Sequence, residues 1–293
     1  MMRSRLVLLA LASALVALFL SPVGASAAPP PRTYVALGDS YAAGPLIPVQ
    51  EEPWGCLKST NNYAKHVAAR LEIELRDATC SGASTRHMTE EHGVFPEANP
   101  PQFDSLDAGV DYVTLQIGGN DIGFGGIAET CARAAFEGES CRSQYVDDSG
   151  RDELAERIER TAPKVAAVLQ GIAERAPDAR VLVLGYSGIF RIGETASCPA
   201  MGVGEEDARY LRNVQESLNA MLAAQADLND ARYVDVYWPS EGKTACDLPV
   251  LRWVEPIVPV HAAAPLHPNL TGMLAVADLL EPAFTHGHEN RKG

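Results

Sequence analysis

The sequence predicts an α/β fold of three layers, in which helices cover both faces of a doubly wound, five-stranded parallel sheet. Three observations lead to this prediction. Apolar runs rich in β-forming residues alternate along the chain with segments of helical periodicity. Most of these runs are apolar throughout, which is typical of parallel strands buried on both faces. Polar or glycine-rich turns follow the first three runs, at the edge where such sheets bind ligands.

A predicted signal peptide, residues 1–28, precedes a single predicted domain over residues 29–293. Two arginines come before an apolar stretch at residues 6–20, and a run of small residues follows it. This stretch is short for a membrane span, which needs about 20 apolar residues. We therefore expect cleavage near Ala27 or Ala28 and a secreted protein with no stable membrane insertion.

The composition is acidic, with 38 Asp and Glu against 24 Lys and Arg and a net charge of −14. Loss of the two signal-peptide arginines leaves 22 basic residues and a net charge of −16. This surplus repels nucleic acid and anionic membranes. We expect no nucleic-acid partner and a monomer. All six cysteines follow the signal peptide, and their even number predicts three disulfides whose pairing the count leaves open.

In the first half of the domain, strands are expected at residues 33–37, 73–78 and 112–117, with a helix over 61–71. The first and third strands stop at glycine, and apolar residues at every fourth position from Tyr63 give the helix one apolar face.

In the second half, strands are expected at 181–184 and 233–237, and helices at 152–175, 205–226 and 271–284. Ser149 is expected to cap the first of these helices, and Pro177 lies just beyond its end. The glycine-rich segment 123–128 superficially matches a dinucleotide-binding fingerprint. It begins well after its strand ends, and no acidic residue closes a following strand at the expected distance. We expect it to form a flexible wall of the crevice.

Ser40 and His267 are the candidate nucleophile and base. Ser40 directly follows the strand-ending Gly38-Asp39, so its hydroxyl and its own N–H face the crevice. Attack on an ester needs a base for the hydroxyl and donors for the new oxyanion. The proline after His267 disfavours a helix there, and a neutral imidazole on a loop is a competent base. Considered without the other site residues, Ser40 would be interpreted as a helix cap and His267 as a surface residue.

Four sequence blocks occur in order: Gly-Asp-Ser-Tyr-Ala-Ala-Gly at 38–44, Ser-Gly-Ala at 81–83, Gly-Gly-Asn-Asp at 118–121 and His-Pro-Asn at 267–269. Together they resemble the SGNH hydrolases, also called the GDSL esterase and lipase family. The likeness spans essentially the whole mature chain. It implies the three-layer, flavodoxin-like SGNH hydrolase fold and a secreted serine esterase or lipase. Such an enzyme hydrolyses carboxylic esters of small molecules or lipids without a cofactor or metal.

The resemblance also implies a role for each matching residue. Ser40 is the nucleophile and His267 its base. The backbone N–H groups of Ser40 and Gly82, with the side-chain amide of Asn120, form the oxyanion hole. Asp39 and Asp121 are interpreted as structural residues that hold turns near the site.

One position departs from the family pattern. Many members carry an aspartate three residues before the histidine, where this chain has Ala264. The sequence is similar to a secreted actinobacterial branch with three disulfides, in which a main-chain carbonyl replaces that carboxylate. We therefore expect a Ser-His dyad whose histidine Nδ1–H is accepted by the Ala264 carbonyl. In that branch neighbouring cysteines pair, which here means Cys56 with Cys80, Cys131 with Cys141, and Cys198 with Cys246.

Other interpretations stay open. Ser187 lies in a Gly-Tyr-Ser-Gly segment that partly resembles the nucleophile elbow of α/β-hydrolases, although Ile189 stands where that elbow needs glycine. The acidic segment 147–149 is compatible with calcium or with helix capping. The histidine pairs His261/His267 and His286/His288 are weak metal candidates without partner ligands at suitable spacing.

The substrate is expected to be a fatty-acyl ester, because export and apolar loop residues favour lipids: Leu46, Ile47, Phe95 and Phe190. A carbohydrate deacetylase or a phospholipase on the same fold is the alternative, as is a non-catalytic protein that binds sugar or lipid.

Overall fold

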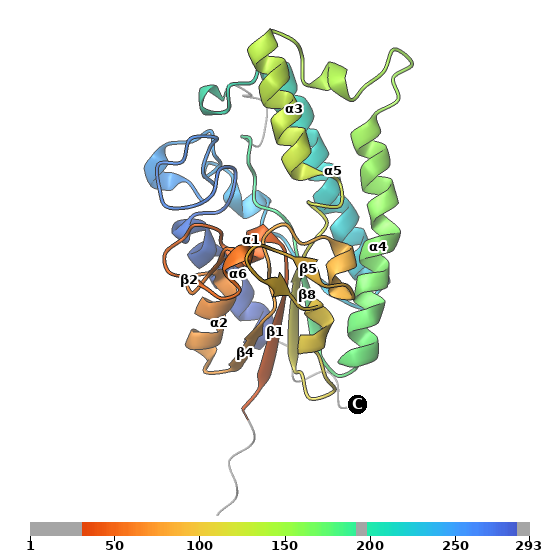
Figure 1. Ribbon diagram of the computed structural model, residues 1–293, viewed down its shortest axis with the longest axis vertical. Coiled ribbons are helices and arrows are strands. Elements are labelled where there is room, and N and C mark those ends of the chain that lie inside the picture. The colour runs from red at the N-terminus through yellow and green to blue at the C-terminus, as the bar shows by residue number, and fades with distance from the viewer. Residues whose placement is uncertain (1–30, 192–197, 286–293) are drawn as a thin grey trace, which may run out of the picture. The chain divides into compact units, whose positions relative to one another are not determined.

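A computed structural model describes residues 31–191 and 198–285 (Figure 1). The predicted signal peptide and the pair His286/His288 lie outside the described residues. Within the described part, no helix is long and apolar enough to cross a membrane.

Five parallel strands form the central sheet in the order β4-β1-β7-β8-β9. Their bounds are β1 Thr33–Gly38, β4 Glu74–Asp77, β7 Tyr112–Gln116, β8 Arg180–Leu184 and β9 Arg232–Val234. Counted along the chain this order is 2-1-3-4-5, the doubly wound arrangement of flavodoxin-like folds. The order reverses at β1 and β7, so the loops after these two strands diverge and open a crevice. The predicted fold class is confirmed.

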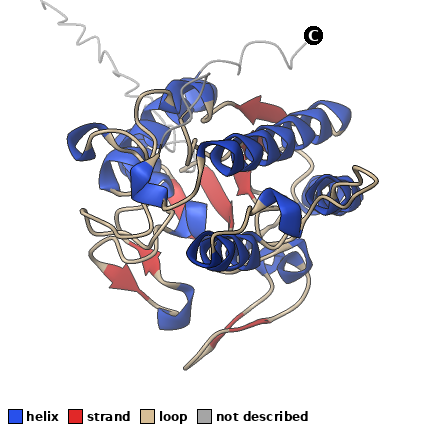
Figure 2. Cartoon of the chain, turned by 90° about the horizontal axis from the view of Figure 1, so that it is seen from above, coloured by secondary structure: helices blue, strands red, loops and turns tan. Residues whose placement is uncertain are grey.

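Helices cover both faces of the sheet (Figures 1 and 2). On one face α2, Tyr63–Leu71, packs beside α6, Leu270–Thr285. On the other face α4, Glu153–Arg175, packs beside α5, Glu205–Leu228. A further helix, α3, Phe124–Glu137, lies beyond the C-terminal ends of the strands, near α5 (Figure 1). The crevice at that edge is thus bounded by α3 and α5.

Strand β1 shows why the predicted strands are apolar at successive positions. Val35 and Leu37 belong to the core cluster that includes α4 and α5 side chains, whereas Tyr34 and Ala36 belong to the cluster that includes α2 and α6 side chains. Successive side chains of a strand point to opposite faces, and here both faces are covered. All four side chains are fully buried.

Short elements complete the fold. They are α1 Ser40–Ala43, the hairpins of β2 Gln50–Glu51 with β3 Lys58–Ser59 and β5 His92–Gly93 with β6 Ala98–Asn99, and seven 3-10 segments at Trp54–Cys56, Thr85–Met88, Gln102–Ser105, Arg142–Gln144, Pro199–Met201, Trp238–Ser240 and Pro249–Leu251. The disulfides join Cys56 to Cys80, Cys131 to Cys141, and Cys198 to Cys246. This is the pairing that the resemblance implied.

The structure corrects two expectations about local structure. The segment 123–128 is the start of helix α3, which Gly123 precedes with φ of 85°. The cap of α4 is Asp152, whose side chain accepts hydrogen bonds from the N–H groups of Leu154 and Ala155. Ser149 lies in the preceding turn, three residues before that cap.

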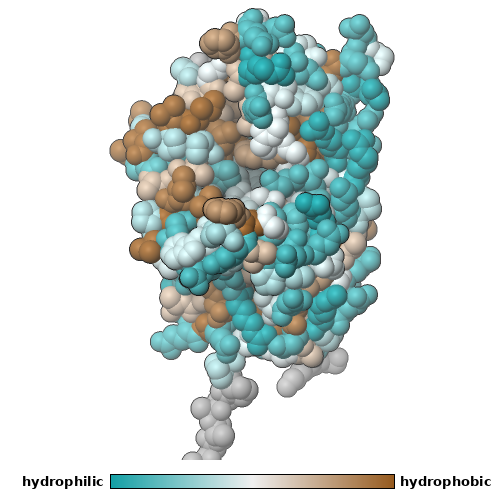
Figure 3. All heavy atoms as spheres, viewed as in Figure 1, coloured by the Kyte–Doolittle hydropathy of each residue, from teal (hydrophilic) through white to brown (hydrophobic). Residues whose placement is uncertain are grey.

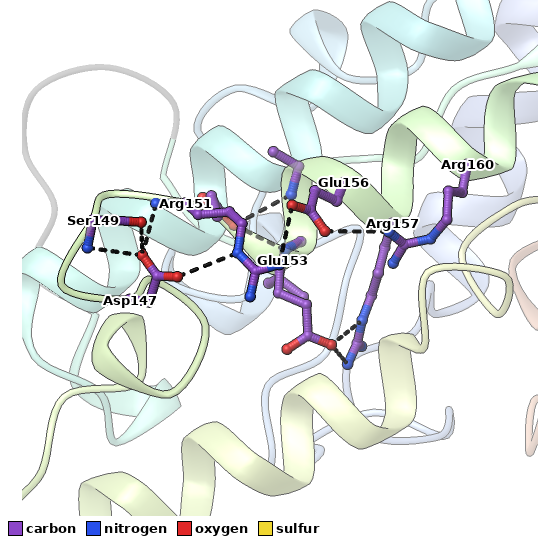
Figure 4. A network of polar contacts seen from close by, with 10 residues as sticks. Asp147, Ser149, Arg151, Glu153, Glu156, Arg157 and Arg160 are labelled. Atoms are coloured by element: carbon purple, nitrogen blue, oxygen red, sulfur yellow. Dashed lines mark hydrogen bonds and ion pairs between the residues drawn. The ribbon is translucent and has the colours of Figure 1, made fainter.

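The turn before α4 also bears on the calcium interpretation. The Asp147 carboxylate accepts hydrogen bonds from Ser149 and Arg151, and ion pairs Glu153–Arg157 and Glu156–Arg160 continue along α4 (Figure 4). A calcium ion at this turn would need the Asp147 carboxylate as a ligand. The positively charged Arg151 already pairs with that carboxylate. Among the residues that the structure describes, no three metal-ligand side chains cluster. We interpret Asp147 as a turn-forming residue.

Candidate active site

The turn after β1 presents Ser40 at the C-terminal edge of the sheet. Gly38 ends the strand with φ of 154°, and a Cβ there would lie 2.6 Å from the Gln116 carbonyl oxygen of β7. Only glycine therefore lets the chain turn so close to its neighbour. Asp39 caps α1 by accepting the Tyr41 N–H at 2.9 Å, which makes Ser40 the first helical residue. Because Ser40 is the first residue of α1, its backbone N–H has no acceptor within the helix.

His267 meets Ser40 from the loop before α6. Its Nε2 lies 2.7 Å from the Ser40 Oγ, although 227 positions separate the two residues. Tyr41 helps to hold this loop beside Ser40, because its hydroxyl donates to the Leu266 carbonyl at 2.7 Å. The turn after β1 thus holds the loop before α6 directly.

The other ring nitrogen of His267 corrects the prediction about Ala264. Its Nδ1 lies 2.7 Å from the Pro265 carbonyl oxygen. The Ala264 carbonyl instead accepts the main-chain N–H of His267 at 3.2 Å and so closes a tight turn. Proline at the second position and Leu266 with φ of 64° at the third are features of a type II turn. The central carbonyl, that of Pro265, is left to face the imidazole.

The pKa of His267 lies below its ordinary value. Burial lowers this pKa, and the hydrogen bond to the Pro265 carbonyl opposes the shift. The imidazole is therefore neutral at neutral pH. A neutral ring in contact with a hydroxyl can act as a general base.

Asn120 lines the same cavity as Ser40 and contacts the residue after Gly82. Gly82 has φ of 83°, and the Asn120 side-chain amide donates to the Ala83 carbonyl at 2.8 Å. One amide hydrogen of Asn120 stays available because the group carries two. Within the described part of the chain, the N–H groups of Ser40 and Gly82 have no protein acceptor. The N–H groups of Ser40 and Gly82 and one amide hydrogen of Asn120 are thus free to donate.

Asp39 and Asp121 both bind backbone groups. The Asp121 carboxylate accepts the Thr85 N–H at 2.9 Å and so joins the loop after β7 to the segment after Gly82. Asp39 accepts the Tyr186 hydroxyl at 2.6 Å, and that hydroxyl in turn accepts the Gly119 N–H at 2.9 Å. Burial raises the Asp39 pKa to about 7, against the opposing hydrogen bonds from Tyr186 and Tyr41.

Tyr186 is a residue that sequence reasoning missed in this role. It follows β8 and connects the turns after β1 and β7 through its fully engaged hydroxyl. The only sequence signal was its place directly after Gly185 at a strand end. Its neighbour Ser187, the alternative nucleophile, is 2% exposed, and its carbonyl accepts the Gln215 amide. The serine in contact with His267 is Ser40.

Comparison with known proteins decides the family. Residues 36–275 match the model of the GDSL-like lipase/acylhydrolase family. The chain belongs to this family. A protein named Lipase 2 from Streptomyces coelicolor is 37% identical over 273 residues, covering 89% of this chain and 90% of the relative. This GDSL protein is a carboxylic ester hydrolase.

Solved structures are similar along most of the chain. The extracellular lipase from Streptomyces rimosus has a TM-score of 0.71 at 26% identity and covers 86% of this chain and 99% of its own. A phospholipase A1 from Streptomyces albidoflavus has a TM-score of 0.69 at 23% identity, with 85% and 98% coverage. The latter likeness concerns the fold alone.

A cavity of about 290 Å³ opens beside Ser40 in this GDSL hydrolase. Helices α3 and α5 contribute nine of its lining residues, and the segments around Ser40, Asn120, Ile189, Met201 and Leu266 contribute most of the others. The wall is almost entirely apolar, with the side chains of Phe124, Ile127, Ala128, Phe190, Met201, Val203, Leu211, Val214, Leu218 and Ile257. Sequence reasoning named Phe190 among the apolar loop residues and expected the segment 123–128, which begins α3, to form a wall of the crevice. Both predictions are confirmed, whereas the contribution of α5 was missed. Leu46, Ile47 and Phe95 do not line the cavity.

The histidine pair His261/His267 does not form a metal site. His261 Nδ1 lies 2.7 Å from the Glu255 carboxylate, and both ring nitrogens of His267 are engaged as described above. The ring of His267 instead packs against Tyr41, with centroids 5.3 Å apart.

Proposed function

We propose that this GDSL hydrolase cleaves fatty-acyl esters through a Ser40–His267 dyad. The 2.7 Å contact between Nε2 and Oγ is the observation that carries the proposal. His267 takes the hydroxyl proton as Oγ attacks the ester carbonyl. The tetrahedral oxyanion accepts hydrogen bonds from the Ser40 N–H, the Gly82 N–H and the Asn120 amide. The His267 imidazolium then protonates the leaving alcohol.

The acyl-enzyme is hydrolysed by the same groups. His267 removes a proton from water, which attacks the ester bond to Ser40, and returns the proton to Oγ as the acid leaves. The Pro265 carbonyl accepts the Nδ1–H throughout and stabilises the imidazolium that forms in each half-reaction. A carbonyl dipole is a weaker partner than a carboxylate, but it fixes the same tautomer.

The cavity supports an acyl chain as the bound group. Fatty chains need an apolar wall, whereas the sugar part of a carbohydrate ester needs many hydrogen-bonding side chains, and this wall is almost entirely apolar. At about 30 Å³ for a water-sized group, the cavity holds about ten methylene groups. We propose medium-chain acyl esters as the best substrates.

Export is part of the proposal. The signal-peptide pattern of residues 1–28 and the three disulfides support it, since disulfides persist in oxidising compartments. The printed description of the Streptomyces rimosus relative as extracellular agrees with it. Mass analysis of the protein from culture medium tests it, because the proposal requires an N-terminus near residue 29.

A series of nitrophenyl esters tests the acyl assignment. We expect kcat/KM to rise with acyl length up to about ten carbons and then fall. Ala128→Leu adds bulk to the cavity wall and should shift the optimum to shorter chains. Ala224→Leu, on the exposed side of α5, is the control and should leave the optimum unchanged. Highest activity on acetyl esters of sugars would contradict the proposal.

A further inference from the structure

In the segment 248–260, which lies between β9 and α6, the charged side chains are buried and the exposed side chains are apolar. Every exposed side chain from residue 248 to residue 260 is apolar. These side chains form what we call the 248–260 surface: Leu248 at 66% exposure, Val250 at 82%, Leu251 at 50%, Ile257 at 40%, Val258 at 76% and Val260 at 63%. Soluble proteins rarely expose apolar groups in such a contiguous set without a binding role.

The two charged residues of this segment point inward and fix its shape. The Glu255 carboxylate is fully buried and accepts the Asn269 amide at 2.6 Å and the Val260 N–H at 2.8 Å. Arg252 is 8% exposed and donates to the Asp247 carbonyl at 2.7 Å. The apolar side chains are therefore presented by a hydrogen-bonded loop with a defined shape.

The 248–260 surface is continuous with the acyl cavity. Ile257 belongs to both, and Pro265 and Leu266, close to the catalytic histidine, line the same cavity. Figure 3 shows apolar side chains gathered at the upper left, over the loops that Figure 1 draws in blue. A molecule bound to this surface would lie beside the cavity entrance.

We infer that the 248–260 surface docks the enzyme onto the surface of an uncharged lipid aggregate. No charged side chain is exposed within the 248–260 surface, so this surface has no group that could pair with a charged partner. The net charge of −14 opposes approach to anionic membranes. Protein interfaces usually surround an apolar centre with hydrogen-bonding residues, which this segment does not expose. Docking would let an acyl chain pass from lipid to cavity without crossing water, a benefit that rests on the proposed function.

Vesicle binding by the mature protein tests the inference. Ser40→Ala is used as the background so that lipid is not consumed. We expect this protein to partition onto phosphatidylcholine vesicles in a flotation assay. Adding Val250→Ser and Val258→Ser should weaken partitioning at least about tenfold, because each removes apolar surface that enters the lipid. Leu228→Ser, at an exposed apolar position at the end of α5, is the control and should not weaken it.

Two further measurements separate the outcomes. With Ser40 restored, Val250→Ser/Val258→Ser should hydrolyse a soluble short-chain ester at the wild-type rate, and this readout reports the proposed function independently of docking. Partial replacement of phosphatidylcholine by phosphatidylglycerol should not strengthen binding. The inference is overturned by absent vesicle binding, by equal binding of all variants, or by a requirement for phosphatidylglycerol. Concentration-dependent dimers abolished by the double substitution, without vesicle binding, would assign the surface to a second copy instead.

Discussion

The Nδ1 atom of His267 lies 2.7 Å from the carbonyl oxygen of Pro265, only two residues away. The orientation of the imidazole is thus set within its own turn. Leu266, with φ of 64°, lets the intervening carbonyl face the ring, and Tyr41 holds that turn through the Leu266 carbonyl. The proposed dyad consequently needs no carboxylate from another part of the chain.

Removing either aspartate that precedes His267 on nearby loops should leave catalysis intact. The Asp235 carboxylate accepts the Tyr237 N–H, and Asp247 binds Thr244 and Arg191, so neither contacts the imidazole. We expect Asp235→Ala and Asp247→Ala to keep kcat within about threefold per titrated active site. Substitution of a working triad aspartate lowers kcat about 10⁴-fold. A loss approaching that size in either folded variant would refute the dyad.

The pH dependence of kcat/KM should report His267. The neutral imidazole is the active form, so activity is lost as pH falls through its pKa. Because burial lowers this pKa, the midpoint should lie below the ordinary histidine value of about 6.5. A stopped assay with a soluble ester across the acidic range measures it. A midpoint clearly above the ordinary value would contradict the assignment.

Asn120→Ala should lower kcat about 10²- to 10³-fold with little change in KM. In the proposed mechanism the amide donates to charge that develops only in the transition state, and loss of one such donor costs about 2.7 to 4 kcal/mol. Asn61→Ala is the control, because the Asn61 amide also donates to a main-chain carbonyl, that of Pro48, outside the site. Equal effects of the two substitutions would show that Asn120 acts only by supporting the fold.

Asp39 should make stability depend on pH. Its folded pKa of about 7 lies above the unfolded value of about 3.9, so the folded state binds the extra proton. Its contribution is fully present below the unfolded pKa and is lost as pH rises through the folded pKa. Between about pH 4 and pH 7 the wild type should therefore lose up to about 4 kcal/mol relative to Asp39→Asn.

Urea unfolding of both proteins across that interval checks the Asp39 prediction. Because all other titrating groups are shared, the difference between the two free energies of unfolding isolates residue 39. A difference that stays constant with pH, or one that grows in favour of the wild type as pH rises, would mean that Asp39 is an ordinary ionised cap.

The sequence patterns predicted most of the fold because the central strands β1 and β7 are buried on both faces. Each of the five predicted strands became a strand of the sheet within a few residues of the expected bounds. Helix α3 was missed because glycines at 123, 125 and 126 hide its start, and glycine is a poor helix former. Tertiary packing around the cavity decides its conformation.

The site was less predictable where it depends on backbone angles. Ser40 and His267, the proposed catalytic pair, could be found in the sequence from their residue types. The choice between the Ala264 and Pro265 carbonyls depends on the positive φ of Leu266, which a leucine does not signal. Tyr186 and the cavity wall depend on contacts between elements far apart in the chain, which no local pattern encodes.

Labelling with a fluorophosphonate tests the central claim most directly. Wild type, Ser40→Ala and Ser187→Ala are each incubated with the probe, digested and mapped, and their turnover of a medium-chain nitrophenyl ester is measured. We predict one label on the Ser40 peptide in the wild type and in Ser187→Ala, both fully active. Ser40→Ala should lose the label and at least about 10⁴-fold in kcat. Retained labelling and turnover in Ser40→Ala, or their loss in a folded Ser187→Ala, would contradict the account.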